Sequence, residues 1–324
     1  MKIKSIYCIT ATLVFILGYG CSKDYLDEKP PHIIASESLF TDLAGFEAGL
    51  NGLYSLARAE RREYEGCEFI FNGTDNICSN YPQNYLYQDW GGLNNPEDAD
   101  FKWLFEWLYS TINSANTIIN RAENEDIDWS GGGTAPGDNK NRVIAEARAL
   151  RALSYRHLTY GWGDVPMVFK EAVGSEIKTD WERSPVAEIR KLIISDFKFA
   201  QQHIPVEGSL RGRLTKGAVQ HWLAEMYLLM NKPDSALFWT NQVIDNPAYK
   251  LITERYGVKK SDPGIPFMDM FIEGNQNREE GNTEALWVTQ FELGAIGGEG
   301  TRIRRIHGGR YDTWQIGAVK PWRI

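Results

Sequence analysis

Apolar side chains recur at three- and four-residue steps along much of the chain, and this spacing restricts the fold more than any other sequence feature. The pattern runs over residues 38–62, about 101–122, about 141–160 and 186–200, and a further run follows Thr215. Such steps place apolar side chains on one face of an α-helix, and several such faces are buried only when helices pack together. We therefore predict a mainly α-helical fold.

Capping residues place two of the helix starts. Ser184 is the predicted N-cap of one helix, with Pro185 at the first helical position and Pro205 at the end. Thr215 is the predicted N-cap of the next helix. Residues 38–62 are predicted to form one long amphipathic helix.

The helix after Thr215 and its successor carry a more specific pattern. Leu223, Ala224 and Tyr227 are followed by the turn 231–234 and then by Ala236, Val243 and Pro247. These offsets fit a tetratricopeptide repeat, in which small alanines let two antiparallel helices approach each other. With the other helical hairpins, the repeat predicts an α-solenoid-like, tetratricopeptide-like domain over residues 21–250.

The composition and the periodicity of the sequence change after Leu251. Glycine, proline and short β-like runs predict an irregular, loop-rich region over residues 251–324. We expect one or two short strands there, one of them over residues 284–291.

The N-terminus predicts export. Lys2 and Lys4 precede an apolar run, 6–19, that is shorter than the about 20 residues needed to cross a bilayer, so residues 1–20 are predicted to be a cleaved signal peptide. Cleavage just before Cys21 is typical of bacterial lipoproteins and predicts an acyl chain such as palmitate on Cys21. The alternative is an ordinary signal peptide in which Cys21 is incidental. The mature part would then be a folded body on a lipid tether.

Charge and cysteine content restrict the partners. The net charge is −8 and no sustained cluster of lysine and arginine occurs, which argues against nucleic acid as a ligand. Apart from Cys8 and Cys21, the only cysteines are Cys67 and Cys78. They either form a disulfide or stay two separate thiols, and spacing alone does not decide between these states.

No motif predicts catalysis or a bound metal. Residues 126–131 match the start of a calcium-binding loop, but Gly137 stands where the closing glutamate would be, so we expect a solvated loop. The five histidines are scattered without metal-ligand spacing, and the adjacent pair Glu279 and Glu280 is expected to be solvated surface. We expect no catalytic residues, no metal and no cofactor.

Aromatic residues are the candidate ligand contacts, because their faces stack on sugar rings. Four tryptophans lie on periodic segments and are expected to pack in the core: Trp103, Trp107, Trp222 and Trp287. Segment 80–90 joins two predicted helices and mixes rings with amides. Its predicted contacts are, in order of preference, Trp90, Tyr85 and Tyr87, with Asn84 and Asp89. The alternative is that these rings only pin the loop against the helices. Trp129 and Trp314 are further loop candidates.

Short motifs occur in order along the chain. They are residues 21–31 (Cys-Ser-Lys-Asp-Tyr-Leu-Asp-Glu-Lys-Pro-Pro), 50–54 (Leu-Asn-Gly-Leu-Tyr), 108–116, 146–155, 163–166 (Gly-Asp-Val-Pro), 212–218 and 284–291. In this order they resemble the SusD/RagB family of outer-membrane nutrient-binding lipoproteins from Bacteroidetes-type bacteria. The resemblance covers roughly residues 21–291.

The resemblance implies a non-enzymatic receptor at the cell surface. Such a receptor captures oligosaccharides, or in one branch peptides, for a TonB-dependent (SusC-like) transporter of the outer membrane. Two alternatives stay open: capture of peptides or another nutrient by the same architecture, and a lipid-anchored glycosidase, whose carboxylates a single sequence does not reveal. Members of the family are usually much longer, so we expect residues 251–324 to be the start of a C-terminal region in a truncated product or fragment.

Overall fold

The structure is a computed structural model that describes residues 36–63, 66, 69, 74, 97–123, 126–172, 178, 180–292, 294, 295, 298 and 300. The part up to Leu39, which holds the short helix α2 (Ser36–Leu39), forms one unit. The part from Phe40 onward forms a second unit, and everything below concerns this second unit.

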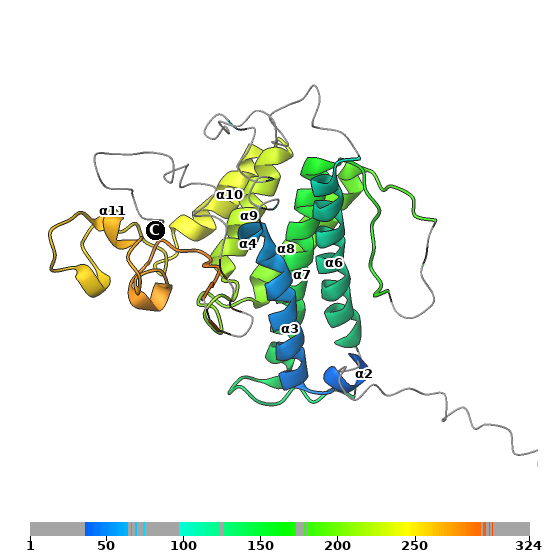
Figure 1. Cartoon of the computed structure of the whole chain (residues 1–324), viewed down its shortest axis with the longest axis horizontal. Coiled ribbons are helices and arrows are strands. Elements are labelled where there is room, and N and C mark those ends of the chain that lie inside the picture. Colours follow the sequence, from blue (N-terminus) through cyan, green and yellow to red (C-terminus); the bar gives the residue numbers. More distant parts are fainter. Residues whose placement is uncertain are drawn as a thin grey trace, which may run out of the picture. The chain divides into compact units, whose positions relative to one another are not determined.

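The second unit is built from antiparallel helices, so the prediction of a mainly helical fold is confirmed. The longer helices are α3 (Leu43–Ala57), α6 (Ala99–Arg121), α7 (Pro136–Gly161), α8 (Val186–His203), α9 (Lys216–Leu229) and α10 (Pro233–Ile244). From α6 to α10 each helix packs on the next along the chain, and α3 packs on both α6 and α7 (Figure 1). A short helix, α4 (Ala59–Arg62), follows α3.

The centre of the core is α7, which is in contact with α3, α6 and α8. Its alanines at 145, 147, 149 and 152 are fully buried, which lets neighbouring helices approach on several sides. The facing stripes are apolar: Leu104, Leu108 and Ile112 on α6 are fully buried, as are Ile189 and Phe197 on α8. The periodic spacing in the sequence therefore marks the buried faces correctly.

Capping decides where two helices begin. The predicted continuous helix over 38–62 is wrong, because Asp42 has extended backbone and its Oδ1 accepts a hydrogen bond from the Gly45 N–H at 2.8 Å, so α3 starts at Leu43. Ser184 is not the N-cap of α8. Its N–H donates to the Val165 carbonyl at 2.9 Å, and Pro185 takes the capping position. The Thr215 cap is confirmed, since its hydroxyl accepts from the Ala218 N–H.

The helical hairpin α9–α10 has the geometry that the repeat pattern predicts. Ala224 and Ala236 are buried, and Tyr227 is buried as well. Asn231 turns the chain with a φ of 54°, and the Lys232 N–H donates to the Tyr227 carbonyl at 2.9 Å. Pro233 then opens α10 at a position where no backbone donor is required.

The region after α10 is irregular. Between Leu251 and Glu292 its only helical pieces are η2 (Gly257–Lys259), α11 (Pro266–Asp269) and η3 (Arg278–Glu280). A polar cluster orders it: Asp269 is fully buried, accepts two hydrogen bonds from Arg255 at 2.7 and 2.9 Å, and accepts one from the Tyr256 N–H. Among the described residues, no helix has both the length and the hydropathy that crossing a membrane would need.

The strand predicted over residues 284–291 is not formed. In the described part of the chain, β-type pairing is limited to the isolated bridges Asp42–Asp128 and Val165–Ser184. Side chains occupy the carbonyls that a partner strand would have used: Arg278 donates to Ala285 at 2.9 Å and Thr215 to Leu286 at 2.5 Å. The carbonyls of Ala285 and Leu286 are therefore satisfied by side chains rather than by a neighbouring strand.

A buried ion pair joins three helices. Arg151 on α7 donates to both oxygens of Asp196 on α8, at 2.8 and 2.9 Å, and to Asn116 Oδ1 on α6 at 2.8 Å. Asn116 in turn donates to the Val168 carbonyl at 2.9 Å. Burial raises the pKa of Asp196, and the Arg151 guanidinium opposes that rise.

We expect Arg151→Leu to destabilise the fold by about 3–5 kcal/mol, because it leaves a buried carboxylate and a buried amide oxygen without their donor. Urea unfolding followed by far-ultraviolet circular dichroism measures the change. The double variant Arg151→Leu/Asp196→Leu should recover part of the loss, since it removes the unpaired carboxylate. A single-variant loss below about 1 kcal/mol would contradict a structural role for the pair.

Candidate functional site

The loop between α8 and α9 is fixed by one buried arginine. Arg213 donates to Glu146 Oε2 at 3.1 Å, to Glu47 Oε2 at 2.8 Å and to Asn51 Oδ1 at 2.8 Å. Its guanidinium also lies over the ring of Tyr54, 4.9 Å from the centroid. Residues 205–215 are thereby joined to both α3 and α7.

Tyr54 completes this arrangement. Its hydroxyl donates to Glu146 Oε2 at 2.7 Å and accepts from the Leu214 N–H at 2.9 Å. Burial, together with the charge of Glu146, raises the pKa of Tyr54 well above its ordinary value, so the hydroxyl keeps its proton as a donor. Glu146 and Arg213, which belong to the motifs noted in the sequence, are therefore part of the scaffold.

A second arginine fixes the facing segment. Arg278 donates through Nε and Nη2 to the two carboxylate oxygens of Glu207, both at 2.9 Å, and through Nη2 to the Ala248 carbonyl at 2.6 Å. Its guanidinium lies 4.6 Å from the ring centroid of Tyr249. The region after α10 is thus joined to the loop that follows α8 by a bidentate ion pair.

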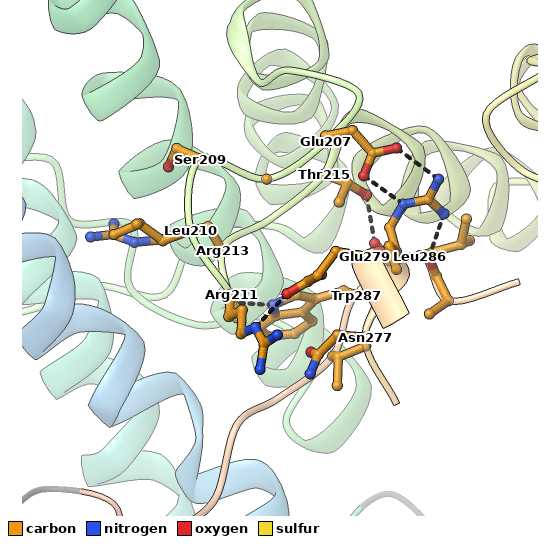
Figure 2. A pocket seen from close by; sticks show the side chains of 15 residues that line it. Glu207, Ser209, Leu210, Arg211, Arg213, Thr215, Asn277, Glu279, Leu286 and Trp287 are labelled. Atoms are coloured by element: carbon orange, nitrogen blue, oxygen red, sulfur yellow. Dashed lines mark hydrogen bonds and ion pairs between the residues drawn. The ribbon is translucent and has the colours of Figure 1, made fainter. Parts of the chain in front are cut away.

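Between these two segments lies a cavity of about 490 Å³, which we call the junction pocket (Figure 2). Its lining comes from residues 207–213, 215, 277–279 and 285–288. The exposed polar groups include Arg211 and Glu279, with side chains 58% and 51% exposed, which form an ion pair across the pocket. Arg211 also contacts Glu280 at 3.3 Å.

The pocket wall at η3 is held by a capping box. Asn277 and Glu280 cap each other's backbone, and the Asn277 N–H donates to Glu280 Oε2 at 2.8 Å. This hydrogen bond lowers the pKa of Glu280, and the charge of Arg211 adds to the effect. The expectation that Glu279 and Glu280 are only solvated surface is wrong for Glu280, whose carboxylate shapes the wall.

Trp287 supplies the aromatic face of the pocket. Its indole N–H donates to the Gly212 carbonyl at 2.8 Å, and its ring meets that of Trp222 edge-on at 5.6 Å. Gly212 has a φ of +83°, and a Cβ there would lie 2.9 Å from Gln290 Cγ, so this position requires glycine. A fixed indole beside the exposed guanidinium of Arg211 and carboxylate of Glu279 is suited to a polar ligand that has an apolar face.

The predicted contact residues Trp90, Tyr85, Tyr87, Asn84 and Asp89 lie outside the described residues, as do Cys21, Cys67, Cys78 and Trp314. Trp129 is only 8% exposed and its ring centroid lies 4.6 Å from that of Phe46, so the prediction that Trp129 contacts ligand is wrong. Trp103, Trp107 and Trp222 pack in or against the core as predicted.

The loop 126–131 is held by hydrogen bonds within it and from its neighbours, since Asn139 donates to the Trp129 and Gly131 carbonyls at 3.1 and 3.0 Å. The pKa of Asp128 is lowered by a hydrogen bond from the Ser130 side chain and by a second from the Ser130 N–H, which Asp128 Oδ1 accepts at 2.9 Å. Across the part of the chain that the structure describes, no three histidine, cysteine, aspartate or glutamate side chains gather in a way that could hold a metal ion.

Sequence reasoning missed the junction pocket because its walls are distant in the sequence. Arg211 and Trp287 come from segments more than seventy positions apart, and no spacing rule links the two. The available signals were the runs 212–218 and 284–291, which both contribute lining residues, but neither run shows that it meets the other in the fold.

A family model described as "Starch-binding associating with outer membrane" (SusD-like_3) matches residues 24–228. SusD-like protein P25 of Formosa agariphila is 24% identical to the chain, covering 93% of this chain and 56% of the relative. A SusD-like protein of Bacteroides ovatus is also 24% identical, covering 89% of this chain and 50% of the relative. The chain thus spans about half the length of the curated relatives it matches.

Solved structures share the fold. A SusD homologue from Bacteroides thetaiotaomicron superposes with a TM-score of 0.63 at 16% identity, covering 81% of this chain and 49% of its own. A laminarin-binding SusD-like protein gives a TM-score of 0.58 at 19% identity, covering 82% of this chain and 57% of its own. A structure with a xylogluco-oligosaccharide gives 0.57 at 21% identity, covering 78% of this chain and 48% of its own.

We expect Arg278→Met to loosen one side of the junction pocket while leaving the helices intact, because it removes the bidentate pair with Glu207 that joins the two walls there. Hydrogen exchange of the amides in residues 277–288 should accelerate by roughly tenfold or more, since a charged hydrogen bond contributes about 1.5–3 kcal/mol. The matched control is Arg211→Met, which removes an exposed pair and should change exchange little. Equal effects of the two variants would contradict the assigned role of Arg278.

Proposed function

Because the chain belongs to the SusD-like family, whose model matches residues 24–228, we propose that it is a cell-surface receptor that binds oligosaccharides at a bacterial outer membrane. This family match is the observation that carries the proposal. The printed descriptions of two proteins with the same fold support it, since one binds laminarin and the other is seen with a xylogluco-oligosaccharide.

Two parts of the chain are proposed to contact the sugar. Segment 80–90 supplies rings and amides for sugar faces and hydroxyls, with Trp90 as the main contact, beside Tyr85, Tyr87, Asn84 and Asp89. The junction pocket supplies Trp287, Arg211 and Glu279. A guanidinium and a carboxylate are donor and acceptor for neighbouring hydroxyls of one sugar ring.

We propose binding without turnover. Glycosidases use two carboxyl groups, one of them protonated, placed on either side of the scissile bond. In the junction pocket, Glu207 is engaged by Arg278 and Glu279 by Arg211, so each carboxylate already has a cationic partner. This pairing favours a binding surface over an acid–base pair.

The proposed partner is a TonB-dependent, SusC-like transporter, which would take up the ligand that this receptor captures. The proposed position is outside the cell, with the acyl chain on Cys21 in the outer membrane. Capture of peptides by the same architecture is the alternative, and hydrolysis of the sugar is a further outcome of the test below.

Calorimetric titration of the purified chain with a panel of neutral oligosaccharides tests the proposal. We expect binding without any new reducing ends, and Trp90→Ala should weaken it roughly tenfold or more, because loss of a central aromatic contact costs about 2 kcal/mol.

The matched control is Trp181→Ala, which removes a tryptophan that is 45% exposed and has the Lys178 ammonium 4.8 Å from its ring centroid. A pocket variant, Arg211→Met/Glu279→Met, measures how much the junction pocket contributes to the affinity for the sugar. Binding of a peptide library in place of every sugar would reject the carbohydrate assignment, and release of reducing ends would reject a purely binding role.

Cys21→Ser should abolish incorporation of an alkyne-tagged palmitate analogue in a host with lipoprotein processing, because the thiol is the proposed acylation site. Labelled protein detected in a gel measures this. Cys67→Ser is the control and should keep the label. Persistent labelling of the Cys21→Ser protein, or an unlabelled but cleaved wild-type protein, would contradict the lipid anchor.

A further inference from the structure

A second cavity, of about 370 Å³, lies between α8 and the end of α9. Lys191 and Lys198 stand two turns apart on one face of α8, and Lys232 lies in the turn before α10. The apolar part of the lining comes from Ile194, Tyr227 and Met230. We call this cavity the lysine groove, and it shares no lining residue with the junction pocket.

The charges of the lysine groove have one sign. All three of its charged residues are lysines, and no carboxylate lines it. Lys191 contacts Glu188 at 2.8 Å, but both side chains are largely exposed, and such surface pairs exchange easily with another anion. Within the described residues, neither Lys198 nor Lys232 forms an ion pair; the Lys198 ammonium lies 5.9 Å from the ring centroid of Tyr227.

This concentration of cations contrasts with the charge of the chain as a whole, which is −8. Ammonium groups that share one concave surface raise the local positive potential, and an anion bound among them lowers the repulsion. Lysine is a flexible point charge with rotatable donors, so it accepts carboxylate, sulfate or phosphate without a fixed planar geometry.

The apolar lining restricts what carries the anion. Ile194, Met230 and Tyr227 offer carbon surface beside the ammonium groups, which favours a ligand with an apolar face as well as a charge. A sugar ring has C–H groups on its faces, and a uronate or a sulfate ester adds the negative charge. The volume of the groove suits one such sugar residue rather than a long chain.

We propose that the lysine groove binds an acidic sugar residue, a uronate or a sulfate ester, of an oligosaccharide ligand. The proposal rests on the proposed carbohydrate-binding function and adds a charge preference to it. The groove recognises the anion with Lys191, Lys198 and Lys232 and contacts the ring with the apolar lining.

Calorimetric titration with linear trigalacturonate and with its full methyl ester measures how the negative charge of the ligand changes its affinity, because the two ligands differ only at the carboxyl groups. We expect the wild-type chain to bind the acid roughly tenfold more tightly than the ester at low salt, and the ratio to fall as salt screens the lysines. In Lys198→Gln/Lys232→Gln the ratio should approach one, with ester affinity unchanged.

The matched control is Lys259→Gln/Lys260→Gln, which removes two exposed lysines from η2 and its C-cap and causes the same change in net charge. It should keep the tenfold ratio. A ratio near one in the wild-type chain, or an equal fall in both double variants, overturns the proposal. So does lysine-dependent binding to vesicles of anionic lipid without preference for the acidic sugar.

The experiment also separates this proposal from the proposed function. If neutral oligosaccharides and the ester bind, but the acid binds no more tightly than the ester, the receptor function stands and the charge preference fails. If no sugar of any charge binds, both fail. Reductively methylated lysine signals in ¹³C spectra provide a second readout, since those of Lys198 and Lys232 should shift with the acid only.

Discussion

The contact of Arg213 with Glu47 and Glu146 is the interaction on which the rest of the structure depends. It joins the loop before α9 to α3 and α7, and Tyr54 closes the same cluster through Glu146 and the Leu214 N–H. Buried charges are tolerated only when paired and hydrogen-bonded, so these side chains fix one position of the loop. That position sets the direction of α9, and with it one wall of the junction pocket.

The helical part of this fold could be predicted from the sequence because a helix with one buried face has apolar residues at three- and four-residue steps. The stripe that contains Leu104, Leu108 and Ile112 is the face that packs, and Thr215 caps the helix it was expected to cap. Helix ends were predicted less well. Asp42 interrupts the first predicted helix by accepting a local hydrogen bond from the Gly45 N–H, a capping signal that the apolar period does not contain. Ser184 instead pairs with Val165, a neighbour that only the tertiary structure supplies.

The region after α10 and the junction pocket could not be derived in this way. The run 284–291 alternates like a strand, but whether it forms one depends on a partner, and here Arg278, Thr215 and Arg58 take its carbonyls. Trp287 was rightly expected to pack, yet the same ring also lines a cavity. A residue such as Trp287, which packs against the core and also lines a site, shows only the core role in its sequence pattern.

The bidentate pair of Arg278 with Glu207 has a thermodynamic consequence, because it ties the irregular region to the helical layer beside the junction pocket. A ligand in that pocket would touch both sides and bind only while they are together. Mass action then converts occupancy into thermal stability, by RT ln(1 + [L]/Kd). The irregular region would gain most from this effect, so its melting temperature would report on whether the junction pocket is occupied.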